Sequence, residues 1–456
     1  MGSIWAVAVN TIKQALRMRI AIVFIVMLLF LLPVMGLSTV GDATLKGRLQ
    51  TFVSYGLSLT SLLLCLLTII ASVYSLTSDI KQMQIQTVIT KPIRRAQLLL
   101  GKLLGVIILN AALLVLFSAV IYAIVIYTPK FSNVPGDEVA QAENEFFTAR
   151  AGLMPREVDV TEEVTDAYNK LERSGQLDQV FRGMSRKEIA ARLTIQKKLE
   201  KRAAAVGQEL VWQFNNVKPL DPRQTLFVRF KYDVLVSPPD QQVYGQWFAG
   251  DDRQIYVGKP KTPIRGFERK DSVRTFHEIE VPADVVAKDG YLAVGFRNVP
   301  LNNTVVIFPL EDGLEVLYRA DTFTANFIRA VLLILLRLVF LAVLGILAAT
   351  FLSFPVAILL CLVVFFTGTV SGFVLESFDF MSENLGAFYS YTFRPIIKLL
   401  PQFDKFNPTR YLVYGRLLSW SLLARVAGIM ICIKAVLLLA LGLLIFERRE
   451  IAKVTV

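Results

Sequence analysis

Residues 20–40, IAIVFIVMLLFLLPVMGLSTV, decide the fold, because this run of 21 residues contains no charged side chain. An α-helix rises about 1.5 Å per residue, so about 20 mainly apolar residues cross the hydrocarbon core of a bilayer. Five further runs meet this requirement: about 52–76, 99–127, 327–351, 355–375 and 426–446. The sequence therefore predicts a polytopic α-helical membrane protein with six transmembrane helices.

The N-terminus has two interpretations. A signal peptide has an apolar core of about 7–15 residues, whereas the run at 20–40 is longer and begins after residue 19, so we interpret it as an uncleaved span. Within residues 1–19, an apolar face alternates with a polar one at helical spacing: Trp5, Val9, Ile12, Leu16 against Asn10, Lys13, Gln14, Arg17. This pattern predicts a helix in the membrane interface. The alternative is a soluble turn that only precedes the span.

The composition excludes a disordered chain, because 54% of the residues are hydrophobic and only 19% are charged. The net charge of +12 is unevenly distributed. Residues 129–325 hold 27 Lys and Arg against 29 Asp and Glu, which leaves 22 basic and 8 acidic residues of the totals 49 and 37 for the apolar remainder. The basic excess therefore belongs to the membrane loops and disfavours a nucleic-acid binder.

Basic residues in short loops indicate which side of the membrane faces the cytoplasm. Residues 1–19, the loop between spans two and three, and the tail at 448–456 are all basic, and six spans place them on one side. We expect both termini in the cytoplasm and residues 129–325 outside it. The expected organisation is 1–19, interfacial helix; 20–128, spans one to three with a polar segment at 77–100; 129–325, extracytoplasmic domain; 326–447, spans four to six with a longer extracytoplasmic segment at 376–424; and 448–456, tail.

The extracytoplasmic domain changes character along its length. Residues 137–207 contain strong helix formers, with Thr161 and Ser185 as candidate N-caps. Residues 208–320 contain short β-rich runs separated by Pro, Gly, Asn and Asp, a pattern typical of an antiparallel β-sandwich. Exposed aromatic residues in this part could stack on a sugar, although such residues more often belong to a core: Tyr244, Trp247, Phe248, Tyr256.

Motifs for catalysis are missing. No G-x-x-x-x-G-K-[ST] phosphate-binding loop occurs, and Gly101-Lys102 lacks the upstream glycine and the hydroxyl residue. The single histidine, His277, has no cysteines nearby, and the three cysteines lie in apolar runs. We expect no catalytic residue, no metal site and no cofactor bound by this chain.

The loop between spans two and three carries the most informative motif. Residues 78–104, SDIKQMQIQTVITKPIRRAQLLLGKLL, resemble the motif that type-2 ABC exporter permeases carry there, I-x-x-E-x-x-x-G-T-L-x-x-L-L-T-x-P-[IV]-x-R-x-x-x-L-x-G-K. The matching positions are Ile80, Thr87, Thr90, Pro92, Ile93, Arg95, Leu99, Gly101, Lys102. Residues 81–84, KQMQ, depart from the acidic residues and glycine usual in that family.

Two later motifs are similar to the same family. Residues 400–406, LPQFDKF, resemble the L-P-x-L-x-x-F that precedes the last span, and residues 446–450, FERRE, resemble the closing F-x-R-R-E. The resemblance implies an export permease in the inner membrane of a bacterium, driven by separate cytoplasmic ATPase subunits, which would bind ATP and Mg²⁺. It implies that residues 77–100 are the coupling segment and that residues 376–424 are a re-entrant segment. It also implies a second permease copy or a homologous permease. The implied ATPase-coupling residues are Asp79, Lys81, Thr87, Thr90, Pro92, Arg94, Arg95.

Charged residues inside the predicted spans need a separate interpretation. Arg337 lies in span four and Lys434 in span six, and each costs about 2.5–3.5 kcal/mol at the centre of a membrane helix on insertion scales. They contact an anionic substrate or lipid headgroup in one interpretation. In the other they form a structural pair or snorkel, with Glu376 as the candidate partner.

A second interpretation gives the chain a function of a different class. It would be a membrane-anchored receptor or assembly protein, whose external β-sandwich binds a periplasmic protein or a glycan. A third interpretation joins the two: the ATPase drives motion of the external domain instead of transport. The motif between spans two and three favours the permease, because a pure anchor has no need of a coupling segment.

Overall fold

The structure is a computed structural model that divides the chain into two units. Residues Met1–Ala149 and Thr322–Val456 form the first, and residues Arg150–Asp321 form the second. The residues that it describes are 2–38, 44–81, 94–131, 134–182, 184–221, 224–257, 262–379, 392, 395, 397, 400–404 and 406–448.

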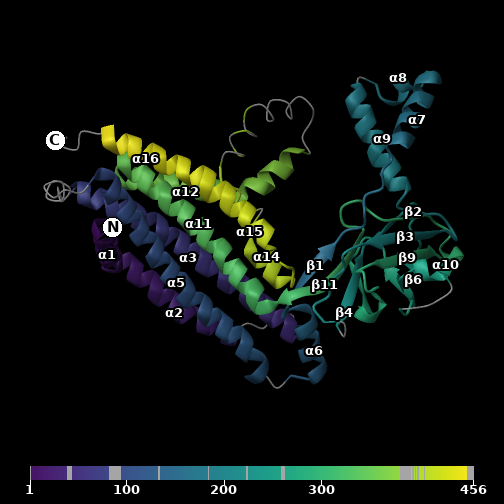
Figure 1. The fold of residues 1–456 in the computed structure, drawn as a ribbon, viewed down its shortest axis with the longest axis horizontal. Helices are drawn as coiled ribbons and strands as arrows, with labels where there is room; N and C mark the ends of the chain where they lie inside the picture. Colours follow the sequence, from purple (N-terminus) through teal and green to yellow (C-terminus); the bar gives the residue numbers. More distant parts are fainter. Residues whose placement is uncertain are drawn as a thin grey trace. The chain divides into compact units, whose positions relative to one another are not determined.

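The first unit is a bundle of helices (Figure 1). Six helical segments of its described part are long and apolar enough to cross a membrane, which confirms the predicted number and places. They are α2 (Arg19–Ser38), α3 (Leu45–Lys81), α5 (Arg95–Phe131), α11 (Phe323–Phe351), α12 (Phe354–Asp379, apolar to Leu375) and the segment Trp420–Arg448. Such a set of helices is typical of a multi-pass membrane protein.

The six helices differ in how deeply they are buried. In α3 and α11, 72% and 67% of the most apolar window is buried, whereas the value is 17% for α2 and 22% for both α12 and the last segment. Helices α3, α5 and α11 pack on one another in the described part of the bundle. The apolar surfaces of α2, α12 and the last segment are therefore left for lipid or for another protein.

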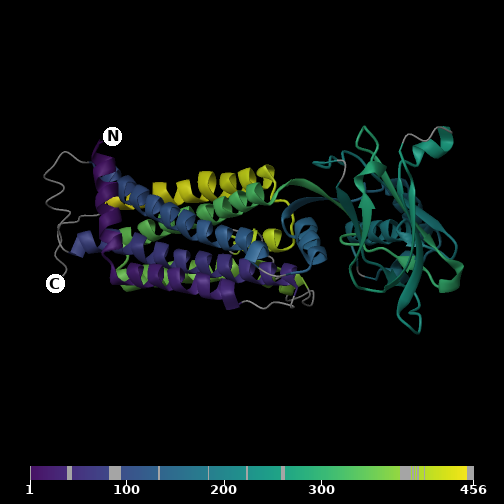
Figure 2. The ribbon, with the colours of Figure 1, turned by 90° about the horizontal axis from the view of Figure 1, so that it is seen from below.

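Residues Gly2–Leu16 form helix α1, as the helical pattern of residues 1–19 predicts. Figure 2 shows it, in purple beside the N label, lying across one end of the bundle. Its buried residues are small, Ala8, Thr11 and Ala15, and they pack on α5. The large apolar residues Trp5 and Leu16 are exposed, and the location of α1 in a membrane interface stays a prediction.

The last apolar segment is not a regular α-helix. It consists of α15 (Trp420–Ala427), a π-helical stretch (Gly428–Ala435) and α16 (Val436–Arg448). Before it, α14 (Pro408–Val413) packs against α3 and α11. Much of the predicted re-entrant segment 376–424, including residues 380–391, lies outside the described residues.

The second unit contains the predicted antiparallel β-sheets. Two sheets have four strands, in the orders β1-β11-β4-β8 and β3-β9-β6-β7, and a third has the order β2-β10-β5. Side chains from both four-stranded sheets share one hydrophobic core, among them Phe230 of β4 and Phe296 of β9. The strands are β1 (Thr148–Leu153), β2 (Ala203–Ala204), β3 (Glu209–Phe214), β4 (Thr225–Phe230), β5 (Asp233–Val234), β6 (Gln242–Gly250), β7 (Arg265–Ser272), β8 (His277–Pro282), β9 (Leu292–Asn298), β10 (Val306–Ile307) and β11 (Leu314–Thr322).

Residues 137–207 are not entirely helical. They include strand β1 and most of α6 (Gly136–Glu145), which packs on α3 in the first unit. The helical remainder, α7 (Thr161–Arg173), α8 (Leu177–Val180) and α9 (Arg186–Glu200), has a small core of its own (Figure 1). Ser185 caps α9 in a capping box with Glu188, as expected, whereas Thr161 is the first residue of α7 and Val160 is its cap.

Candidate functional site

The predicted coupling segment begins at the end of α3 and finishes in the first turns of α5. Thr87, Thr90 and Pro92 lie outside the described residues. Of the described candidates, Lys81 and Arg94 are exposed, whereas Asp79 is buried. The two exposed cations are therefore the ones that a partner protein could reach directly.

Asp79 joins three helices at this end of the bundle. Its Oδ2 lies 2.5 Å from Nζ of Lys102 in α5, and its Oδ1 accepts a hydrogen bond of 3.3 Å from Nε2 of Gln14 in α1. Lys102 also donates to the backbone carbonyl of Ser75 in α3. The side chain of Lys102 is only 2% exposed, so this contact is a buried ion pair. Displacing any one of α1, α3 and α5 here must disturb the other two.

Two glycines of α5 allow α1 to approach closely. A Cβ atom at Gly101 would lie 2.7 Å from Cβ of Val7, and one at Gly105 would lie 2.6 Å from the carbonyl oxygen of Ala8. Real Cβ atoms essentially never come within 3.0 Å of another heavy atom, because the two atoms would overlap. Glycine at both positions therefore allows the two helix backbones to come close. The spacing of four residues puts both glycines on one face of α5, where they form the docking surface for α1.

Arg95 connects two of the motifs that resemble those of exporter permeases. Its Nη1 donates to the backbone carbonyls of Phe446, at 3.1 Å, and Glu447, at 2.9 Å. These carbonyls belong to the last turn of α16, where a cation favourably meets the negative end of the helix dipole. Arg95 is therefore a cap for the C-terminus of the last apolar helix.

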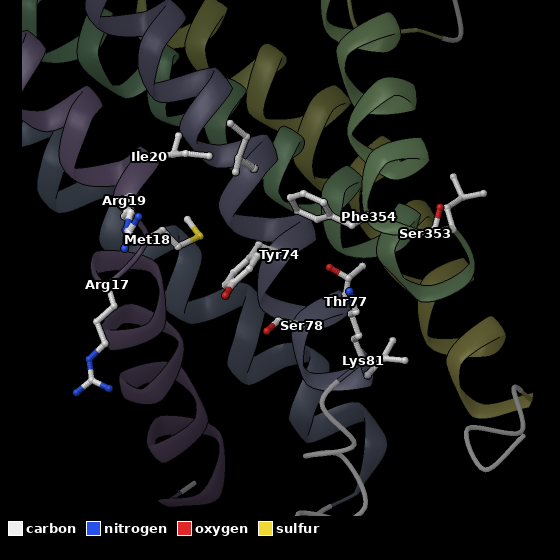
Figure 3. Close-up of a pocket in the computed structure, with 13 residues that line it drawn as sticks. Arg17, Met18, Arg19, Ile20, Tyr74, Thr77, Ser78, Lys81, Ser353 and Phe354 are labelled. Carbon is white, nitrogen blue, oxygen red and sulfur yellow. The ribbon is translucent and has the colours of Figure 1, made fainter. Parts of the chain in front are cut away.

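A groove of about 1110 Å³ lies at the same end of the bundle (Figure 3). Its walls come from the α1–α2 junction, from the end of α3 and from the α11–α12 turn. Tyr74 lies between the junction and Phe354, and the two rings meet edge to face with centroids 6.1 Å apart. The cations lining the groove are Arg17, Arg19, Lys81.

Arg337 lies midway along α11, fourteen residues from Phe323 and fourteen from Phe351. Its Nη2 donates to the carbonyl of Phe403 at 2.9 Å, and its guanidinium lies over the Phe403 ring at 5.1 Å from the centroid. Nη1 is 3.5 Å from the hydroxyl of Ser61 in α3. The structure thus gives Arg337 a partner in the segment that precedes the last span.

Lys434 contacts the same segment. Its Nζ donates to the carbonyl of Leu400 at 2.8 Å, and the residue lies in the π-helical stretch of the last apolar segment. The side chain of Glu376, the partner expected for these cations, lies outside the described part of the chain. The described partners of Arg337 and Lys434 include the backbone carbonyls of residues 403 and 400. Both residues belong to the LPQFDKF motif, but the motif gave no sign of these contacts.

Helix α12 also contacts residues 400–404, the segment that Arg337 and Lys434 contact. The carboxylate of Asp404 accepts hydrogen bonds from the backbone N–H of Gly372 and from the hydroxyl of Ser371, the latter at 2.9 Å. The N–H of Phe403 donates to the carbonyl of Gly368 at 2.8 Å. A Cβ at Gly368 would lie 2.5 Å from the carbonyl oxygen of Pro401, so only glycine permits this approach. The motif at residues 400–404 is therefore fixed by contacts with α11, α12 and the π-helical stretch.

Sequence reasoning missed Asn326, which is fully buried at the start of α11. Its Nδ2 donates to the carbonyl of Arg416, and its Oδ1 accepts from the N–H of Leu418, both at 2.8 Å. Arg329, one turn later, donates to the Leu418 carbonyl at 3.3 Å and lies over the Trp420 ring. A single asparagine after a strand gives little indication in the sequence that it is a structural residue. The available signal was its place at the start of an apolar helix, where a buried amide needs a hydrogen-bond partner.

The second unit has a groove of about 590 Å³ beside Tyr244, between the ends of β5 and β6 and the turn at Pro300–Asn302. Lys270 lies over the Tyr244 ring and pairs with Asp240 at 2.8 Å, and this hydrogen bond lowers the pKa of the Asp240 carboxyl. Of the four aromatic residues singled out, Trp247 is buried in the core, Tyr244 is exposed and Phe248 is part-buried, whereas the side chain of Tyr256 lies outside the described residues.

Metal ligands do not gather in the part of the chain that the structure describes, where no group of three His, Cys, Asp or Glu side chains could hold an ion. Comparisons with protein-family models, with curated proteins and with solved structures gave no match. Membership of the exporter permease family therefore stays a prediction that depends on the three motifs and on the six apolar helices.

Proposed function

We propose that this chain is the transmembrane permease subunit of an ATP-binding-cassette exporter. In this proposal a separate cytoplasmic ATPase binds ATP and Mg²⁺, and this chain is not itself an enzyme. Two permease subunits, identical or homologous, form the transport path. The six apolar helices supply the membrane body, and the exposed faces of α2, α12 and the last segment supply surface for lipid and for the second permease.

The observation that carries the proposal is the junction of α1, α3 and α5 beside the coupling segment. The Asp79–Lys102 ion pair and the Gln14 hydrogen bond lie between the two ends of that segment. A force that an ATPase applies to residues 82–94 would therefore reach two spans and the interfacial helix together. A protein that only anchors an external domain gains nothing from such a junction.

The proposal also assigns an orientation. Exposed cations gather at this end of the bundle: Arg17 after α1, Arg19 at the start of α2, Lys81 at the end of α3, Arg94 before α5 and Arg448 at the end of α16. By the positive-inside bias, this end faces the cytoplasm. Residues 150–321 are then extracytoplasmic, in the inner membrane of a bacterium.

The test is purification of the chain from its native membrane in a mild detergent. An ATPase subunit should copurify, and the complex should hydrolyse ATP while the isolated chain does not. A chain that is recovered intact without any ATPase, in several mild detergents, would contradict the proposal.

A second candidate is a receptor or assembly protein whose external β-domain binds a periplasmic protein or a glycan. The groove beside Tyr244 favours it, because an exposed aromatic ring supplies an apolar face and the neighbouring amide and carboxylate groups can orient a small ligand. The substitution Tyr244→Ala should then abolish glycan binding by the full chain without changing the retention of an ATPase.

A further inference from the structure

The groove at the α1–α2 junction collects positive charge. Arg17, Arg19 and Lys81 line it, are exposed, and have no ion pair with any described residue. They come from two places far apart in the sequence, the α1–α2 junction and the end of α3. Three cations that line one groove give it a positive potential, which attracts an anion.

Two helix N-termini border the same groove. Helix α2 begins at Arg19 and α12 begins at Phe354, and residues of both first turns belong to the lining. The first N–H groups of a helix have no carbonyl partner within it, and the helix dipole is positive there. The hydroxyl groups of Tyr74 and Ser353 add further donors beside these ends. The groove thus combines the features that proteins use to bind phosphate.

The floor of the groove is apolar and continues into the exposed faces of two helices. Ile20, Ile70 and Phe354 line it. Beyond them, α2 and α12 expose large apolar side chains in the described residues: Val23, Val26, Phe30, Val356, Leu359, Val363. A soluble anion would leave this apolar surface unused, whereas an acyl chain would cover it, at about 0.8 kcal/mol per buried methylene group.

We propose that this groove is a binding site for an anionic phospholipid. Arg17, Arg19 and Lys81 hold the phosphate together with the two helix N-termini, and the acyl chains lie along α2 and α12. Basic pockets between membrane helices at the water interface are suited to such headgroups. The inference requires only that the helices span a bilayer, so it holds whether or not the chain is an exporter.

A phospholipid bound in this groove would stabilise the position of the start of the coupling segment. Lys81 is the last residue of α3, Arg17 follows α1, and Ser353 forms the α11–α12 turn. One headgroup that contacts all three elements would hold their relative positions. Loss of a single cation should weaken binding about fivefold, equivalent to about 1 kcal/mol.

The experiment measures the thermal midpoint of the purified full chain in detergent during titration with short-chain phosphatidylglycerol, phosphatidylcholine or glycerol phosphate. Phosphatidylglycerol should raise the midpoint in a saturable way, and the other two should not. The variants Arg17→Gln, Arg19→Gln and Lys81→Gln should each need about fivefold more phosphatidylglycerol for the same shift. Lys13→Gln is the matched control, because Lys13 is exposed on α1 but does not line the groove.

Several results would overturn the proposal. They are equal shifts with phosphatidylglycerol and phosphatidylcholine, wild-type affinity in all three glutamine variants, or an equal loss in Lys13→Gln. A full shift with glycerol phosphate alone would assign the groove to a soluble phosphate and overturn the lipid site. If a glutamine variant does not fold, Arg17→Lys and Arg19→Lys keep the charge and should bind within about twofold of the wild type, since Lys still acts as a point charge toward phosphate; a loss of several-fold there contradicts the proposed contacts.

Discussion

Nζ of Lys102 lies 2.5 Å from Oδ2 of Asp79, and this ion pair is enclosed where α1, α3 and α5 meet. The two residues are 23 positions apart, at opposite ends of the coupling segment. They are far apart in the sequence and in contact in space. Their contact therefore links the two helices, α3 and α5, that flank the polar loop. The pair joins the end of α3 to the first turns of α5.

Removing one partner of this pair should be strongly destabilising. The variants Asp79→Leu and Lys102→Met each leave one buried charge without its counter-ion, which typically costs about 3–5 kcal/mol. The double variant should recover most of the loss, because it leaves neither charge. Chemical unfolding of the four proteins in detergent gives the coupling energy. Losses that simply add in the double variant would show that the two residues act independently.

Because α1 lies so close to α5, adding a single methyl group at their contact should lower the stability of the protein. Gly105→Ala should destabilise the protein by about 1–3 kcal/mol, because the added Cβ meets the Ala8 carbonyl at 2.6 Å. Gly56→Ala is the control, since a Cβ there lies 3.6 Å from the nearest atom of Leu32, an ordinary contact. Thermal midpoints compare the two. Equal effects at both glycines would mean that α1 is not docked as described.

Arg337 and Lys434 are expected to be structural. Each donates to a carbonyl of the segment 400–404, so Arg337→Met and Lys434→Met should each lower the free energy of unfolding by about 1.5–3 kcal/mol. Because both side chains hold one segment, the double variant should lose less than the sum. Arg425→Met, at an exposed position of α15, should change little. Strictly additive losses would argue against a shared segment.

The second unit should show acid sensitivity that depends on Arg253. This side chain lies 2.8 Å from Asp251 and 2.9 Å from Asp289, and its hydrogen bonds lower the pKa of both carboxyls. A lowered folded-state pKa stabilises the fold above the unfolded value of about 3.9, and the contribution is lost as the pH falls through the folded pKa. Arg253→Met should therefore lose less stability than the wild type between about pH 5 and pH 2.

Tryptophan fluorescence can follow this acid transition in the full chain. Trp212 and Trp247 lie in the β-domain core, so replacing Trp5 and Trp420 by Phe leaves a signal from that unit. Lys218→Met, at an exposed position, is the control variant. Identical acid profiles for Arg253→Met and the control would contradict the assigned role of the Arg253 ion pairs.

The apolar helices could be predicted from the sequence because their signal is local. The length and polarity of a run such as 20–40 can be read directly from its residues. The bounds of helix α2 agree with this run to within two residues at each end. The strand-rich half of 129–325 was equally visible in its short β-branched and aromatic runs. Strand β1, TARAGL, was not predicted, because alanine and glycine do not favour strands. Its position depends on pairing with β11, which lies far away in the sequence.

The contacts of the candidate site could not be predicted, because they join distant residues or involve the backbone. Nothing in the sequence states that Lys102 meets Asp79, or that Arg337 meets the carbonyl of Phe403. The helical pattern of residues 1–19 drew attention to large apolar residues such as Trp5, whereas α1 packs on α5 through small ones such as Ala8. Small residues carry no hydropathy signal, but they decide how closely two helices approach.

The central claim is that an ATPase subunit binds at the coupling segment. The most direct measurement is the amount of ATPase retained, and ATP hydrolysed, when Arg94→Glu and Lys130→Glu are purified beside the wild type in mild detergent. Both positions are exposed, and they lie at opposite ends of α5. We expect Arg94→Glu to lose most of the ATPase and Lys130→Glu to retain it. Equal retention by both variants, or no ATPase with the wild type, would contradict the account.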